Sequence, residues 1–76
     1  MTIKLLDTVV LEKDIPEHRL KTGDLGTVVE RYEPDGIEVE FVLGNGKVRA
    51  LLTLKKHEVR ALSESDVFSV RSEDAA

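Results

Sequence analysis

Short runs of alternating apolar and polar residues, with no helical period, dominate residues 1–62 of this chain. The clearest run covers residues 37–43, where Ile37, Val39 and Phe41 alternate with Glu38 and Glu40. A period of two is typical of a strand that turns one face to a core. Four further runs rich in β-branched and apolar residues predict strands at residues 7–12, 25–33, 48–54 and 59–62.

The pair Asn45-Gly46 predicts how two of these strands meet, because Asn-Gly is preferred in two-residue type I′ turns. A three-residue loop would place Phe41 opposite Arg49 and spoil the apolar face, so we predict the two-residue turn. The resulting antiparallel register pairs apolar residues only: Leu43 with Val48, Phe41 with Ala50, Val39 with Leu52, and Ile37 with Leu54.

The segments between the strands carry turn residues. Residues 13–24 contain Pro16 and Gly23 and show neither period, which predicts a long loop that Ile15 and Leu20 could anchor to the core. Residues 33–36 predict a turn and residues 55–58 a single 3-10 or helical turn. The pattern of residues 25–33 leaves open whether Val28 or Val29 faces inward.

Five short strands in so few residues are too small for a two-sheet sandwich, whereas they can close into a small, strongly bent barrel. We therefore predict one all-β domain over residues 1–62. Residues 63–76 are polar and acidic, which predicts a disordered tail. The alternative for this tail is a short segment around Val67, Phe68 and Val70 that adds to a sheet edge.

The stretch Leu20-Lys-Thr-Gly-Asp-Leu-Gly-Thr-Val-Val-Glu30 resembles the KOW motif of SH3-like small barrels. A longer pattern covers about residues 3–62 and is similar to a family of short bacterial proteins of unknown function. Its segments are residues 5–11, Asp14-Ile15-Pro16, the Gly-Asp-Leu-Gly-Thr-Val stretch, residues 38–41 and residues 51–54.

This resemblance implies an SH3-like small barrel for residues 3–62. Together with the sequence pattern, it predicts about five antiparallel strands, a short 3-10 or helical turn before the last strand, and a flexible C-terminal tail that lies outside the resemblance. Related barrels bind RNA, dock onto large complexes or cap an enzyme subunit, so the fold alone selects no function.

Composition argues against a catalytic or metal site and against a membrane-spanning segment. The chain has no Cys, and its two histidines, His18 and His57, stand among charged residues, so we predict no catalytic residue, cofactor or metal site. The pair Glu38 and Glu40 could suit a divalent cation, but a solvated strand face explains it better. No apolar run approaches the ~18 residues of a membrane span. We expect a cytoplasmic protein with no membrane contact.

Charge is unevenly spread along a chain whose net charge is −4. Residues 24–43 carry −5 and residues 44–62 carry +4. These halves either neutralise each other across the hairpin or leave a basic corner for an acidic partner or a phosphate backbone. The basic corner would consist of Lys47, Lys55, Lys56 and Arg60.

Two apolar residues, Val42 and Leu51, fall on the polar face of the predicted hairpin. They are covered by Ile3 and Leu5, by the apolar residues of the tail or by a partner protein, or they are ordinary exposed residues. The predicted partner surface is Glu38, Glu40, Val42, Arg49 and Leu51.

The leading hypothesis is a non-enzymatic SH3-like barrel that binds another protein or takes part in assembly. The alternative is a KOW-like module that binds RNA. The balanced charge of the 13–24 loop and the presence of one Tyr, Tyr32, as the sole candidate for base stacking weigh against the alternative.

Overall fold

The computed structural model describes residues 3–43, 46 and 48–63, with residues 43, 48 and 49 described through their backbone only. The predicted type I′ turn at Asn45-Gly46 and the predicted acidic tail therefore fall largely outside the described residues. Within them, the chain forms five strands and two 3-10 turns: β1 (Thr8–Leu11), η1 (Pro16–His18), β2 (Leu25–Tyr32), β3 (Gly36–Leu43), β4 (Val48–Lys55), η2 (Lys56–Glu58) and β5 (Val59–Ala61).

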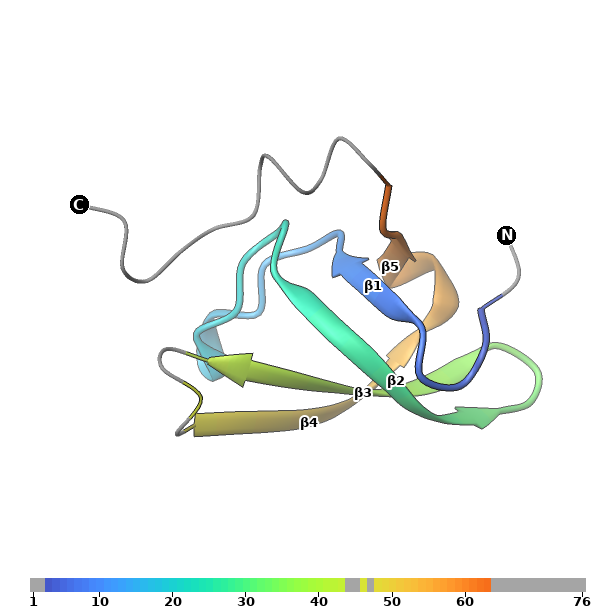
Figure 1. Cartoon of the computed structure of the whole chain (residues 1–76). Coiled ribbons are helices and arrows are strands. Elements are labelled where there is room, and N and C mark those ends of the chain that lie inside the picture. Colours follow the sequence, from blue (N-terminus) through green and yellow to red (C-terminus); the bar gives the residue numbers. More distant parts are fainter. Residues whose placement is uncertain (1–2, 44–45, 47, 64–76) are drawn as a thin grey trace.

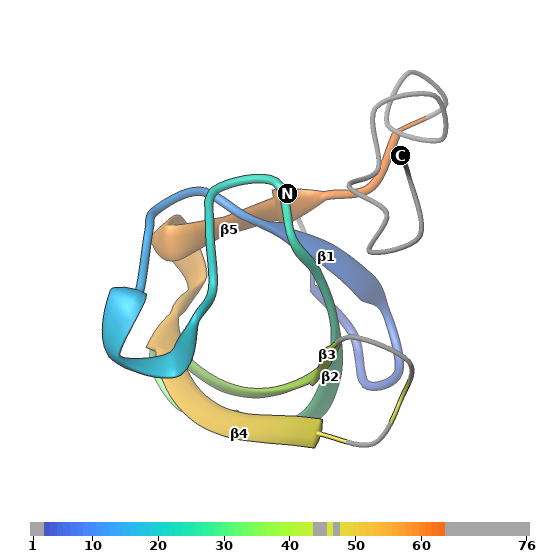
Figure 2. The same cartoon turned by 90° about the vertical axis from the view of Figure 1, so that its left-hand side faces the viewer.

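The five strands belong to one antiparallel sheet in the order β4-β3-β2-β1-β5, which confirms the all-β prediction (Figure 1). The first four strands form a meander, and the chain then passes through η2 so that β5 pairs with β1. Figure 2 shows that the sheet curls, with β4 and β5 at its two ends. Short, strongly bent strands enclose their apolar side chains in this way without a second layer.

The β3–β4 register agrees with the prediction at all four apolar pairs, from Leu43 with Val48 to Ile37 with Leu54. The side chain of Phe41 is 1% exposed, as the alternation in residues 37–43 predicts. Gly46 has a φ of 90°, a backbone conformation that glycine adopts without strain.

The core lies on the inner side of the curled sheet. Its buried side chains come from all five strands and from the segments that close the ends of the sheet. The cluster comprises Ile3, Val9, Leu11, Ile15, Leu20, Val28, Ile37, Val39, Phe41, Leu54 and Val59, and Ala50 and Leu52 pack against it.

A β-bulge in β2 answers the question that the sequence left open. The pairing with β3 shifts between Val28 and Glu30, so that Val29 is an extra residue. Val28 is buried in the core and Val29 is exposed.

The long loop is fastened to the core as predicted. Ile15 and Leu20 are both buried and form an isolated β-bridge. The Asp14 carboxylate closes the loop, because its Oδ1 accepts hydrogen bonds from the Thr22 amide at 2.8 Å and from the Thr22 hydroxyl at 3.1 Å. The turn η1 inside the loop was not predicted.

Candidate functional site

The outer side of the sheet presents a row of four side chains, one from each of β1 to β4. Directly opposed residues in antiparallel strands turn to the same face. Thr8 pairs with Thr27, Thr27 with Glu40, and Glu40 with Leu51. We define the outer face as this row with its neighbours: Thr8, Leu25, Thr27, Glu30, Glu38, Glu40, Val42 and Leu51.

The structure brings four of the five predicted partner-surface residues together on this face. Glu38, Glu40 and Val42 alternate along β3 with the buried residues, and Leu51 lies opposite Glu40 on β4. The fifth, Arg49, pairs with Val42 in the backbone register, and its side chain is outside the described residues.

Two apolar residues of the outer face remain open to solvent. Val42 is 52% exposed and Leu51 is 57% exposed. The register makes them diagonal neighbours, about 7–8 Å apart. Of the alternatives weighed for them, cover by Ile3 and Leu5 does not hold, because Ile3 is 4% exposed within the core and Leu5 is itself an exposed residue. The alternative of the tail falls outside the described residues.

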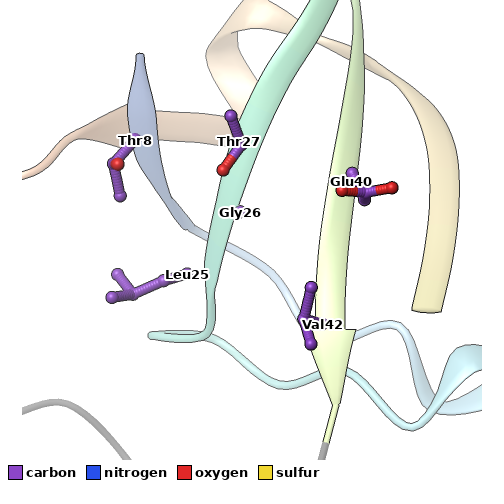
Figure 3. Close-up of a pocket in the computed structure, with 6 residues that line it drawn as sticks. All are labelled: Thr8, Leu25, Gly26, Thr27, Glu40 and Val42. Carbon is purple, nitrogen blue, oxygen red and sulfur yellow. The ribbon is translucent and has the colours of Figure 1, made fainter. Parts of the chain in front are cut away.

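A shallow hollow adjoins Val42 (Figure 3). Its volume is about 250 Å³, and it opens between the ends of β1, β2 and β3. Its mixed lining suits a single small apolar group rather than a whole substrate. The lining residues are Thr8, Leu25, Gly26, Thr27, Glu40 and Val42.

Sequence reasoning did not find the part of this hollow that β1 and β2 contribute. Thr8, Leu25 and Thr27 reach the outer face only through the pairing of β1 with β2. The period of two places Leu25 and Thr27 on one face of their strand, but no local signal says which strand lies beside it.

An acidic group occupies the other half of the outer face. Glu30 on β2 lies directly opposite Glu38 on β3, and Glu40 follows two residues later on the same face. The Tyr32 hydroxyl donates a 2.8 Å hydrogen bond to Oε1 of Glu38. This bond, together with desolvation and the charge of Glu38, raises the pKa of Tyr32 above its ordinary value of 10.0.

The predicted basic residues do not stand apart as a cluster of their own. Lys55 Nζ lies 3.4 Å from Oδ1 of Asp35, and Lys56 Nζ donates to the carbonyl oxygen of Pro34. Arg60 Nε lies 2.8 Å from Oε1 of Glu12, beside a different pair of strands. The remaining member, Lys47, falls outside the described residues.

The described residues bring no metal-binding cluster together. Residues 3–43, 46 and 48–63 contain no group of three or more His, Asp or Glu side chains that could hold a metal ion. Both His18 and His57 are exposed, on η1 and η2 respectively. Among the same residues, no helix is long and apolar enough to cross a membrane.

These features define a small all-β domain built on one curled antiparallel sheet, with a mixed acidic and apolar outer face. Residues 5–61 match a family described as Domain of unknown function (DUF4926). The matched range includes all five strands, and the chain belongs to this family. Comparison with curated proteins found no match, and comparison with solved structures found none either.

Proposed function

We propose that this chain is a non-enzymatic, SH3-like protein-binding module that docks another protein on its outer face. The observation that carries the proposal is the pair Val42 and Leu51, each more than half exposed beside a hollow on a mostly polar face of the sheet. A partner that covers this pair would remove apolar surface from water at the centre of its contact and leave polar residues at the rim.

Rigidity supports the same proposal. Val42 and Leu51 stand on strands whose opposite faces are fixed by the buried Phe41, by the partly buried Leu52 and by eight consecutive β3–β4 pairs. Side chains held by a sheet lose less freedom on binding than side chains on a loop, so more of the contact energy appears as affinity.

Two further observations favour binding over catalysis. The hollow of about 250 Å³ is smaller than the ~300–1,000 Å³ typical of small-molecule sites. No histidine lines it, and Glu40 is its single ionisable residue.

We place the protein in the cytoplasm, in keeping with a chain that has no cysteine.

The alternative of RNA binding gains no comparable support. Lys55 and Arg60 each lie within ion-pair distance of a carboxylate, so a phosphate would compete with an existing partner. Tyr32, the candidate for stacking, has its hydroxyl bonded to Glu38 on an acidic part of the sheet, where a polyanion is repelled.

The proposal is tested with a double variant, Val42→Thr with Leu51→Thr. Threonine is β-branched and suits a strand, and its smaller, more polar side chain reduces the apolar contact. The matched control is Leu62→Thr, an exposed leucine that follows β5. Equal thermal unfolding midpoints for the three proteins establish that the variants fold.

Each tagged protein is recovered from cells of its own source, and co-purifying proteins are quantified by mass spectrometry. We expect a stoichiometric partner with the wild type and with Leu62→Thr, and at least tenfold less of it with the double variant. The proposal fails if the three proteins recover the same set of proteins, or if the wild type is recovered alone.

A further inference from the structure

The chemistry of the partner can be read from the acidic half of the outer face. Glu30 and Glu38 lie directly opposite each other on β2 and β3, an arrangement that places like charges side by side. Within the described part of the chain, neither carboxylate has an ion pair. The nearest cation in sequence, Arg31, donates through Nη1 to the Ile3 carbonyl oxygen at 3.1 Å.

The neighbours of these two carboxylates supply hydrogen bonds without charge. Glu30 accepts the backbone N–H of Arg31 at 3.0 Å, and Glu38 accepts the Tyr32 hydroxyl. Neutral donors orient the two carboxylates but leave their mutual repulsion in place. A cation brought by a partner would relieve that repulsion and contact both carboxylates at once.

Glu30 and Glu38 lie on the same continuous face as Val42 and Leu51. Glu38 and Val42 are four residues apart on β3, which corresponds to about 13 Å along a strand. Leu51 adjoins the midpoint of that line, because it is paired with Glu40. One extended segment could therefore meet both ends of the face.

Charge disfavours two occupants that belong to this protein. Residues 63–76 hold four acidic residues and one arginine, so that segment carries the same sign as Glu30 and Glu38. A symmetric dimer through the outer face would bring no cation to Glu30 and Glu38, because the residues that define this face include no Lys or Arg. The occupant that fits is a different, basic chain.

We infer that the outer face binds a partner segment in which a Lys or Arg side chain lies about 13 Å from an aliphatic side chain. The cation meets Glu30 and Glu38, and the aliphatic group covers Val42 and Leu51 at the hollow. This inference rests on the proposed function and adds the charge and spacing of the partner to it.

The experiment pans a random-peptide phage library against the intact wild-type protein, with counter-selection on Val42→Thr/Leu51→Thr. Selected peptides are synthesised and titrated by fluorescence anisotropy at low and high salt. The charge variant is Glu30→Gln/Glu38→Gln, because glutamine removes the charge and can still accept the Tyr32 hydroxyl. The matched control is Glu17→Gln, an exposed glutamate in η1.

We expect selected peptides that share a basic and an aliphatic residue about four positions apart. Their affinity should fall about fivefold in Glu30→Gln/Glu38→Gln, should weaken with salt in the wild type, and should be unchanged in Glu17→Gln. Peptides that need Val42 and Leu51 but are neutral or acidic would overturn this inference and leave the proposed function standing. A library that yields no peptide dependent on Val42 and Leu51 would overturn the proposed function, and this inference with it.

Discussion

At the residue scale, Gly26 is the position where the absence of a side chain matters most. A Cβ at this position would lie 2.5 Å from Cγ1 of Val39 and 2.8 Å from Cε1 of Phe41. Both neighbours are among the most deeply buried side chains of the core. The glycine therefore leaves the space beside β2 that the core side chains of Val39 and Phe41 fill.

Gly26→Ala should destabilise the domain by about 1–3 kcal/mol, because a packed core makes room for an added methyl group only with strain. The measurement is urea denaturation followed by circular dichroism. Thr53→Ala, an exposed substitution on β4, should cost less than about 1 kcal/mol. Equal stability of the wild type and Gly26→Ala would contradict the packing described for this position.

Leu6 is a second unusual residue, because its φ of 70° lies in the left-handed region while its side chain is 76% exposed. It belongs to a tight turn in which the Asp7 amide donates to the Lys4 carbonyl oxygen at 3.1 Å. A leucine in this conformation is strained, and its exposure means that little burial offsets the strain.

Leu6→Gly should therefore stabilise the domain by about 0.5–1 kcal/mol, the strain relieved exceeding the entropy that glycine adds to the unfolded chain. The matched control Leu5→Gly changes a residue of the same turn that has no positive φ, and it should destabilise. Thermal unfolding of the two variants at equal concentration distinguishes them. A lower midpoint for Leu6→Gly than for the wild type would show that the strain argument is mistaken.

Residue-scale details were the hardest to predict from the sequence. Val28 and Val29 are chemically identical, and a single extra residue in β2 decides which of them enters the core. That bulge depends on pairing with β3, so the local pattern could not reveal it. The left-handed conformation of Leu6 was equally hidden, because leucine is not a residue that predicts a positive φ.

At the element scale, the β3–β4 hairpin was predictable because two independent signals agreed. The alternation of residues 37–43 fixed the inner face, and Asn45-Gly46 fixed the loop length. Their combination gives the register that the structure contains, from Gly36 with Lys55 to Leu43 with Val48. The turn η1 lacked such agreement, since its segment shows no periodicity and its bridge joins only Ile15 and Leu20.

The turn η2 depends on one carboxylate. Oε1 of Glu58 accepts the Lys55 backbone N–H at 2.8 Å, and Oε2 lies 2.9 Å from Lys13 Nζ. These two contacts, the backbone hydrogen bond first, lower the pKa of Glu58 below its ordinary value of 4.5. Glu58 thereby fastens η2 both to the end of β4 and to the loop that follows β1.

This pKa shift predicts part of the acid sensitivity of the domain. The folded state binds the Glu58 proton more weakly than the unfolded chain does. The ionised Glu58 side chain therefore contributes fully to the stability of the fold above its ordinary pKa of 4.5, and this contribution is lost as the pH falls through the lowered pKa of the folded state. Glu58→Gln should be less stable than the wild type at neutral pH, and the difference should shrink as the pH falls below about 4.

The measurement is the free energy of unfolding in urea at a series of pH values for both proteins. Asp14, whose pKa is lowered by the backbone and hydroxyl hydrogen bonds of Thr22, is present in both and cancels from the comparison. A difference in unfolding free energy between wild type and Glu58→Gln that stays constant from neutral to acidic pH would contradict the stabilising role assigned to the Glu58 carboxylate.

At the scale of the whole molecule, opposite charges meet across the sheet and its turns. Lys13 pairs with Glu58, Arg60 with Glu12, and Lys55 lies near Asp35. Sequence reasoning weighed neutralisation between residues 24–43 and residues 44–62 against a basic corner, and of these three pairs Lys55 with Asp35 joins those two segments. The site was predictable in part: the hairpin pattern places its β3 and β4 residues, whereas the hollow requires a β1–β2 contact between distant parts of the sequence.

A chain with a net charge of −4, in which Lys13, Lys55 and Arg60 are paired with carboxylates, should bind RNA no better than a neutral protein does. Titration of labelled single-stranded and duplex RNA at about 50 mM salt should give a flat anisotropy curve. Saturable binding that weakens steeply as salt is added would favour the KOW-like alternative instead.

The central claim is that the outer face, and no other part of the domain, receives a protein partner. The most direct measurement is a ¹⁵N–¹H correlation spectrum of the intact chain recorded while the partner recovered from cells is added. The account predicts that the largest shifts fall on Thr8, Thr27, Val42 and Leu51, with those of η1 and η2 unchanged. Shifts concentrated at η1, η2 or Arg60, with no change in the signals of the outer face, would contradict the claim that the partner binds there.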